Sequence, residues 1–220
     1  MKRIWLIISI LMVIVLMAGC QPVQTTTANK KTIVVTYTLL GSLVQSLVGN
    51  QASVIVSIPN GQDPHEWQPS AKDIENINNA SLVVCNGLDL ESGLTAILTN
   101  AKLRGVPVFT ATDYITIRHV GTGEAVSIDD PDQAPGAADP HIWTDPIAMQ
   151  KVVAALAPSL KTILNIDAES ESKRLQDELS ALDQQIQQIL RPLAVADRKL
   201  VTGHESLGYF AQRYDFKLIG

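Results

Sequence analysis

Residues 32–58, TIVVTYTLLGSLVQSLVGNQASVIVSI, contain the pattern that decides the fold. Residues 32–40 are β-branched and nearly all apolar, as expected for a strand that is covered on both faces. Residues 41–49 place apolar side chains at positions 43, 44, 47 and 48, which is helical spacing, and residues 52–58 read as a second strand. The stretch therefore predicts a strand–helix–strand unit.

The alternation of strands and helices continues to residue 110. Ser70 can cap a helix over residues 71–79, with Asp73 in a capping-box position, and a second helix is expected over residues 88–104. Strands are expected over residues 81–86 and 106–110. This order predicts an α/β fold with a parallel sheet, in which ligands bind outside the carboxyl ends of the strands.

A five-residue phrase occurs twice: Asp63-Pro64-His65-Glu66-Trp67 and Asp139-Pro140-His141-Ile142-Trp143. A third histidine lies in Thr202-Gly203-His204-Glu205, and the whole chain has only four. Neutral imidazoles suit Zn²⁺ and its neighbours. We therefore expect His65, His141 and His204 to meet at one ion, with Trp67 and Trp143 as packing residues around it.

The second half of the chain differs in character from the first. Residues 111–138 form a long, irregular acidic loop in which His119 is interpreted as a surface residue. Helices are expected over residues 147–164 and about 167–190, and the second could act as a stiff spacer. A strand at 199–202, a helix at 204–214 and a strand from 216 begin another α/β unit, from which we infer that the sequence is incomplete.

The first residues have the composition of a targeting segment. A basic start, an apolar run over residues 4–17 and Ala18-Gly19-Cys20 are typical of a bacterial lipoprotein signal, cleaved before Cys20 and lipidated there. A short anchor helix is the alternative, although the run is shorter than the roughly 20 residues that span a bilayer. Residues 20–30 are polar and read as a flexible tether. The protein is then expected to be extracytoplasmic and held to the bacterial membrane by lipid.

Charge and cysteine content exclude some classes of protein. The net charge of −5, without basic runs, argues against a nucleic-acid partner. If Cys20 is lipidated, Cys85 has no partner for a disulfide, and its apolar neighbours predict a small buried residue.

Taken in order, these motifs resemble the zinc/manganese-type solute-binding lipoproteins of metal ABC transporters. The segments that carry the resemblance are the lipoprotein signal, residues 63–70, residues 80–88, residues 141–146, the long helix and residues 203–210. The resemblance implies two α/β lobes joined by one long helix, with a divalent metal ion in the cleft and an ABC permease as partner. It also implies a monomer that is not an enzyme.

The same resemblance divides the chain and places the ligands. Residues 31–165 would be the N-terminal lobe, residues 166–192 the linker helix and residues 198–220 the start of the C-terminal lobe, after a signal peptide over residues 1–19. His65 and His141 match the first-lobe ligands and His204 matches the third, where manganese-type members tend to have glutamate. A carboxylate ligand is expected beyond Gly220.

The chemistry of the ligands leaves alternatives open. Three nitrogens and a carboxylate suit tetrahedral Zn²⁺, whereas Mn²⁺ prefers more oxygen, which Glu205 could supply. A secreted zinc hydrolase with Glu66 or Glu205 as base, or an adhesin, are the competing functions. Asp63, Asp139 and Asp145 could orient imidazoles or could serve as helix caps and turn formers.

Overall fold

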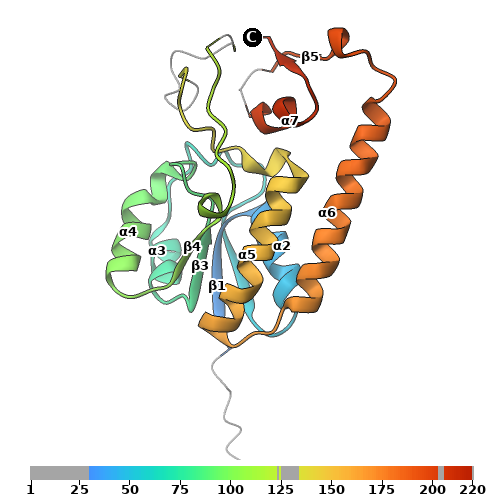
Figure 1. The fold of residues 1–220 in the computed structure, drawn as a ribbon. Helices are drawn as coiled ribbons and strands as arrows, with labels where there is room; N and C mark the ends of the chain where they lie inside the picture. The colour runs from blue at the N-terminus through green and yellow to red at the C-terminus, as the bar shows by residue number, and fades with distance from the viewer. Residues whose placement is uncertain (1–29, 123, 125–133, 203–205, 220) are drawn as a thin grey trace, which may run out of the picture. The chain divides into compact units, whose positions relative to one another are not determined.

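The computed structural model describes residues 30–122, 124, 134–202 and 206–219. Contacts between residues group Lys31–Gly220 as one compact unit. Its elements alternate as the sequence predicts, which confirms the α/β class (Figure 1).

The centre of the unit is a four-stranded parallel sheet in the order β2-β1-β3-β4. The strands are β1 (Thr32–Tyr37), β2 (Ser53–Ile58), β3 (Leu82–Cys85) and β4 (Val108–Thr110). Val34 pairs with Ile55 on one side and with Val83 on the other. Because β1 and β3 are covered on both faces, nearly all of their residues are buried, which explains why their sequences are nearly all apolar.

Helices cover the two faces of this sheet (Figure 1). On one face, α3 (Ala71–Asn78) and α4 (Thr95–Leu103) enclose a smaller core that contains Val34 and Val83. On the other, α2 (Thr38–Val48) and α5 (Pro146–Leu164) enclose the larger core around Ile33 and Val35. The alternate residues of β1 therefore serve two separate cores.

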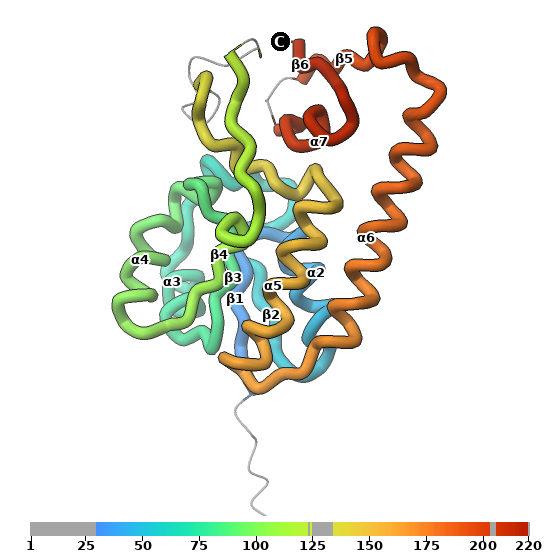
Figure 2. Tube along the Cα trace, in the orientation of Figure 1, coloured from blue at the N-terminus to red at the C-terminus, as the bar shows by residue number. Residues whose placement is uncertain are grey.

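The helix α6 (Glu169–Leu190) packs against α5 and α2 near its start and then leads to the last elements of the chain (Figure 2). These are the 3₁₀ turn η5 (Val195–Asp197), β5 (Lys199–Leu200), α7 (Gly208–Arg213) and β6 (Lys217–Leu218). Strands β5 and β6 pair in parallel as a second, two-stranded sheet. The division into two lobes with α6 as their linker stays a prediction.

Several sequence predictions need correction at element boundaries. The strand expected over residues 32–40 ends at Tyr37, and α2 begins at Thr38. The helix expected over residues 88–104 begins only at η1 (Ser92–Leu94) and continues as α4. The reason is that Gly87, Leu88 and Asp89 all have positive φ, which no right-handed helix contains.

Two cap predictions are confirmed. The side chain of Ser70 accepts a hydrogen bond from the Asp73 amide while the Asp73 carboxylate accepts one from Ser70, a complete capping box for α3. Pro146 occupies the first turn of α5. Among the described residues, α5 is the one helix long and apolar enough to cross a bilayer, but its apolar side lies in the larger core.

Candidate metal centre

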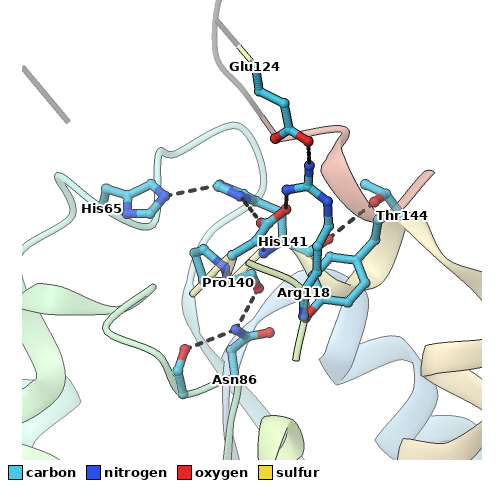
Figure 3. A network of polar contacts seen from close by, with 10 residues as sticks. His65, Asn86, Arg118, Glu124, Pro140, His141 and Thr144 are labelled. Atoms are coloured by element: carbon cyan, nitrogen blue, oxygen red, sulfur yellow. Dashed lines mark hydrogen bonds and ion pairs between the residues drawn. The ribbon is translucent and has the colours of Figure 1, made fainter. Parts of the chain in front are cut away.

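Two of the three predicted histidines face each other. His65 lies in the loop between β2 and α3, and His141 directly precedes the 3₁₀ turn η4 (Ile142–Thr144). Their Nε2 atoms are 3.3 Å apart, and the rings point toward each other (Figure 3). His141 is only 3% exposed, whereas His65 is partly exposed. The fold thus joins two segments that are 76 residues apart.

The repeated phrase forms the same local turn in both places. Asp63 Oδ1 accepts a hydrogen bond from the backbone N–H of His65 at 2.9 Å, and Asp139 Oδ1 accepts one from His141 at 2.9 Å. Such turns are a known use of aspartate, and the proline between the two residues restricts the backbone. The phrase therefore fixes how each imidazole leaves its loop.

Asp139 also binds the ring of its histidine. His141 Nδ1 lies 2.8 Å from Asp139 Oδ1. Burial of the Asp139 carboxyl opposes ionisation, but hydrogen bonds from the His141 ring and backbone, together with the Arg118 charge, lower its pKa below the ordinary value. An ionised carboxylate only accepts hydrogen bonds, so Nδ1 carries a proton. In neutral His141, Nε2 then presents its lone pair toward His65.

One turn after β3 supports both histidine loops. The Asn86 side chain donates to Pro140 O at 2.8 Å, directly before His141 (Figure 3). Ser92 Oγ donates to His65 O at 2.7 Å. Between them, Glu91 accepts hydrogen bonds from the Asn86 and Gly87 amides, which holds the positive-φ turn in place.

The aromatic residues of the phrases pack as predicted. Trp143 contacts Tyr37, with ring centroids 5.3 Å apart, and meets His141 edge-on at 5.4 Å. Trp67 is partly buried against both cores. Asp145, the third aspartate whose role was open, caps α5 by accepting from the Ile147 amide at 2.8 Å.

Other predicted site residues are outside this pair. His204, Glu205 and Cys20 lie outside the described residues. His119 is exposed and forms an antiparallel bridge with Ala138, in agreement with a surface residue. Across the described part of the chain, no three His, Cys, Asp or Glu side chains gather closely enough to hold an ion by themselves.

Sequence reasoning missed four residues that support the centre: Asn86, Ser92, Arg118 and Tyr209. Arg118 Nη1 contacts Asp139 Oδ2 at 3.0 Å, and the Arg118 amide donates to Tyr209 Oη at 3.0 Å. Arg118 and Tyr209 are 91 residues apart, so no local pattern could show their contact. The available signals were an arginine in an acidic loop and the presence of Asn86 and Tyr209 in two of the segments that carry the family resemblance.

A parallel α/β unit with two converging imidazoles is an arrangement that suits a metal-binding protein. The family described as zinc-uptake complex component A, periplasmic (ZnuA), matches residues 33–220. The chain belongs to this family.

Individual relatives agree with this assignment. The manganese-binding lipoprotein MntA of Halalkalibacterium halodurans is 24% identical over 226 residues, which cover 100% of this chain and 71% of the relative. The iron ABC transporter substrate-binding lipoprotein MtsA of Streptococcus pyogenes serotype M1 is 26% identical, over 97% of this chain and 69% of its own. The crystal structure of ZnuA aligns with a TM-score of 0.73 at 26% identity, covering 87% of this chain and 71% of that one.

These findings confirm the resemblance to metal-type solute-binding lipoproteins of ABC transporters. The family is one of solute-binding transport proteins rather than enzymes. Several relatives are named as lipoproteins, which confirms the predicted extracytoplasmic, membrane-anchored location. Because the relatives' names include zinc, manganese and iron, the comparisons establish a metal-ion solute but not which metal.

Proposed function

We propose that this chain binds Zn²⁺ outside the cytoplasm, through His65, His141 and His204, and delivers it to an ABC permease. The observation that carries the proposal is the 3.3 Å separation of the His65 and His141 Nε2 atoms. Two nitrogens at ~2.0–2.1 Å from a tetrahedral ion lie about 3.3 Å apart, so the spacing suits one zinc ion. The family assignment supports the same conclusion.

The Asp139–His141 contact adds a second argument. A metal-binding histidine usually donates its other ring N–H to a carboxylate, which fixes the tautomer and makes the ligand nitrogen more basic. His141 has this arrangement through Nδ1 and Asp139 Oδ1. Its Nε2 therefore needs no reorganisation of the ring to accept an ion.

Manganese is the second candidate, because two relatives named for manganese match 100% and 85% of this chain. Mn²⁺ favours oxygen ligands, and the pair described here presents two nitrogens. The preference for zinc thus depends on the third ligand being His204 rather than the neighbouring Glu205.

Metal analysis of the purified whole chain tests the proposal. After removal of metal with a chelator, the chain is equilibrated with equimolar Zn²⁺ and Mn²⁺ and then desalted. We expect mainly zinc in wild type, and strongly weakened binding in His65→Ala, His141→Ala and His204→Ala. His119→Ala is the matched control, because this exposed histidine lies outside the pair. Retention of manganese over zinc, or equal binding by His119→Ala and His141→Ala, would overturn it.

A further inference from the structure

Next to the candidate metal centre, the Arg118 guanidinium lies between the carboxylates of Asp139 and Glu124 (Figure 3). Nη1 contacts Asp139 Oδ2 at 3.0 Å, and Nη2 pairs with Glu124 Oε1. Arg118 is 8% exposed and Asp139 2% exposed. In such a buried setting, charge-assisted hydrogen bonds are strong and directional.

Arg118 holds the oxygen of Asp139 that the histidine does not use. Oδ1 accepts from the His141 backbone and ring, and Oδ2 accepts from Arg118. The Asp139 amide also donates to Arg118 O at 2.9 Å. The carboxylate is therefore fixed at both oxygens, and rotation that would turn Oδ1 away from the imidazole must first break the Arg118 contact.

The first turn of α7 rests directly on this pair. A Cβ atom added to Gly208 would lie 2.2 Å from Asp139 Oδ2 and 2.4 Å from Arg118 Nη1. The next residue, Tyr209, is buried in the larger core and accepts the hydrogen bond from the Arg118 amide through its hydroxyl. Only glycine at position 208 lets the α7 backbone approach so closely.

We propose that Arg118 is a positioning residue of the metal centre, and that Gly208 and Tyr209 link the placement of α7 to the orientation of His141. The proposal rests on the function proposed above. Ion affinity then depends on whether α7 is docked, because docked α7 keeps Arg118 against Asp139 and Asp139 against the ring. The helix α7, which follows α6 in the chain, thereby changes the affinity for the ion although it contributes no ligand itself.

A simpler role for Arg118 would be to neutralise the buried Asp139 charge. The Gly208→Ala variant separates the two roles, because it removes no charge and no hydrogen-bonding side chain. Alanine is not less favourable than glycine in a helix, so a loss of affinity would arise from the contact with Asp139 and Arg118. Gln212→Ala, at an exposed position of the same helix, is the matched control.

The experiment measures zinc affinity by chelator competition and the His141 Nδ1–H resonance by NMR in the zinc-free whole chain. We expect Gly208→Ala to lose about 10-fold or more in affinity, the usual range for a disturbed outer partner, and to shift the His141 resonance. Gln212→Ala should match wild type in both. Tyr209→Phe, which removes a single hydroxyl, should shift the resonance in the same direction as Gly208→Ala.

Two outcomes would overturn the inference. One is wild-type affinity and an unshifted His141 resonance in both Gly208→Ala and Tyr209→Phe. The other is a loss of zinc affinity in Gly208→Ala with an unshifted His141 resonance, which would mean that the variant does not act through the orientation of the His141 ring. Failure of the proposed function looks different: wild type and His141→Ala would then bind zinc equally, while the zinc-free resonance still reports whether Arg118 and α7 orient the ring.

Discussion

Replacing Asp183 by asparagine should release α7 from the rest of the unit. The Asp183 carboxylate on α6 accepts hydrogen bonds from Arg213 Nε at 2.6 Å and Nη2 at 2.7 Å, and from Tyr214 Oη at 2.9 Å. Gln187 Nε2 is a fourth donor at 2.7 Å. Arg213 Nε also lies 3.3 Å from Oδ1 of Asp145, the cap of α5. One carboxylate thus joins α6 to α7, and its arginine partner joins α7 to α5.

The size of the effect follows from burial. Exposed ion pairs contribute about 0–1 kcal/mol, and loss of one partner from a buried pair costs about 3–5 kcal/mol. Asp183 is 6% exposed, whereas the Arg213 side chain is 25% exposed. We therefore expect Asp183→Asn to lower the free energy of local opening by about 2–3 kcal/mol, which corresponds to exchange about 30- to 160-fold faster.

Native-state hydrogen exchange measures this opening. The amides of Ala211 and Tyr214, which donate to Leu207 O and Phe210 O, should lose protection, while amides of β1 keep theirs. Asp177→Asn is the control, because its pair with Lys173 on the same helix is 72% exposed at the carboxylate and should change exchange little. Equal α7 protection in both variants would refute the assignment of Asp183 as the main link.

The same junction should depend on pH with a definite sign. Hydrogen bonds from Arg213 and Tyr214, together with the Arg213 charge, lower the pKa of Asp183 despite the opposing effect of burial. A lowered folded-state pKa stabilises the fold above the unfolded value of about 3.9, and the contribution is lost as pH falls through the folded value. Protection of α7 should therefore decline in acid in wild type and be flatter with pH in Asp183→Asn.

Three further predictions concern buried positions in and around the four-stranded sheet: Cys85, Glu91 and Gly41. Burial raises the pKa of the Cys85 thiol to about 12, so alkylation at pH 8 should be far slower in folded than in urea-unfolded protein, as mass spectrometry can show. Burial also raises the pKa of Glu91. The free energy of unfolding should therefore decrease as the pH rises from the unfolded-state pKa of Glu91 through its folded-state pKa. In Glu91→Gln, urea unfolding should lack this dependence on pH. Gly41→Ala would place a Cβ 2.6 Å from Val56 Cγ2 and should cost about 1–3 kcal/mol in urea unfolding.

The alternation of strands and helices could be predicted because it depends on local patterns. Apolar runs identified β1 to β4, and Ser70 with Asp73 identified the start of α3. The turn over residues 87–89 could not be predicted, because the sequence over residues 88–104 reads as one continuous helix. The deciding contact is the long-range hydrogen bond from Thr36 Oγ1 to Glu91 Oε1, which holds Glu91 where it can accept the Asn86 and Gly87 amides.

The histidine pair was predictable for a different reason: the repeated phrase marks both positions without any knowledge of the fold. The residues that orient His141 carry no such mark. Arg118 and Tyr209 are 91 residues apart, with α5 and α6 between them in the sequence. Their contact is a property of tertiary packing, which single-sequence patterns do not contain.

The two phrases are alike in sequence, yet the structure makes their imidazoles unequal. Both aspartates form the same backbone turn, and Asp139 also binds the ring of its histidine. Asp63 is exposed, where water competes for its oxygens, whereas Asp139 is buried beside Arg118. The His141 ring is therefore set before an ion arrives, and it is buried, whereas His65 is partly exposed. Of the two loops, the one around His65 is better suited to adjust to the size of the ion.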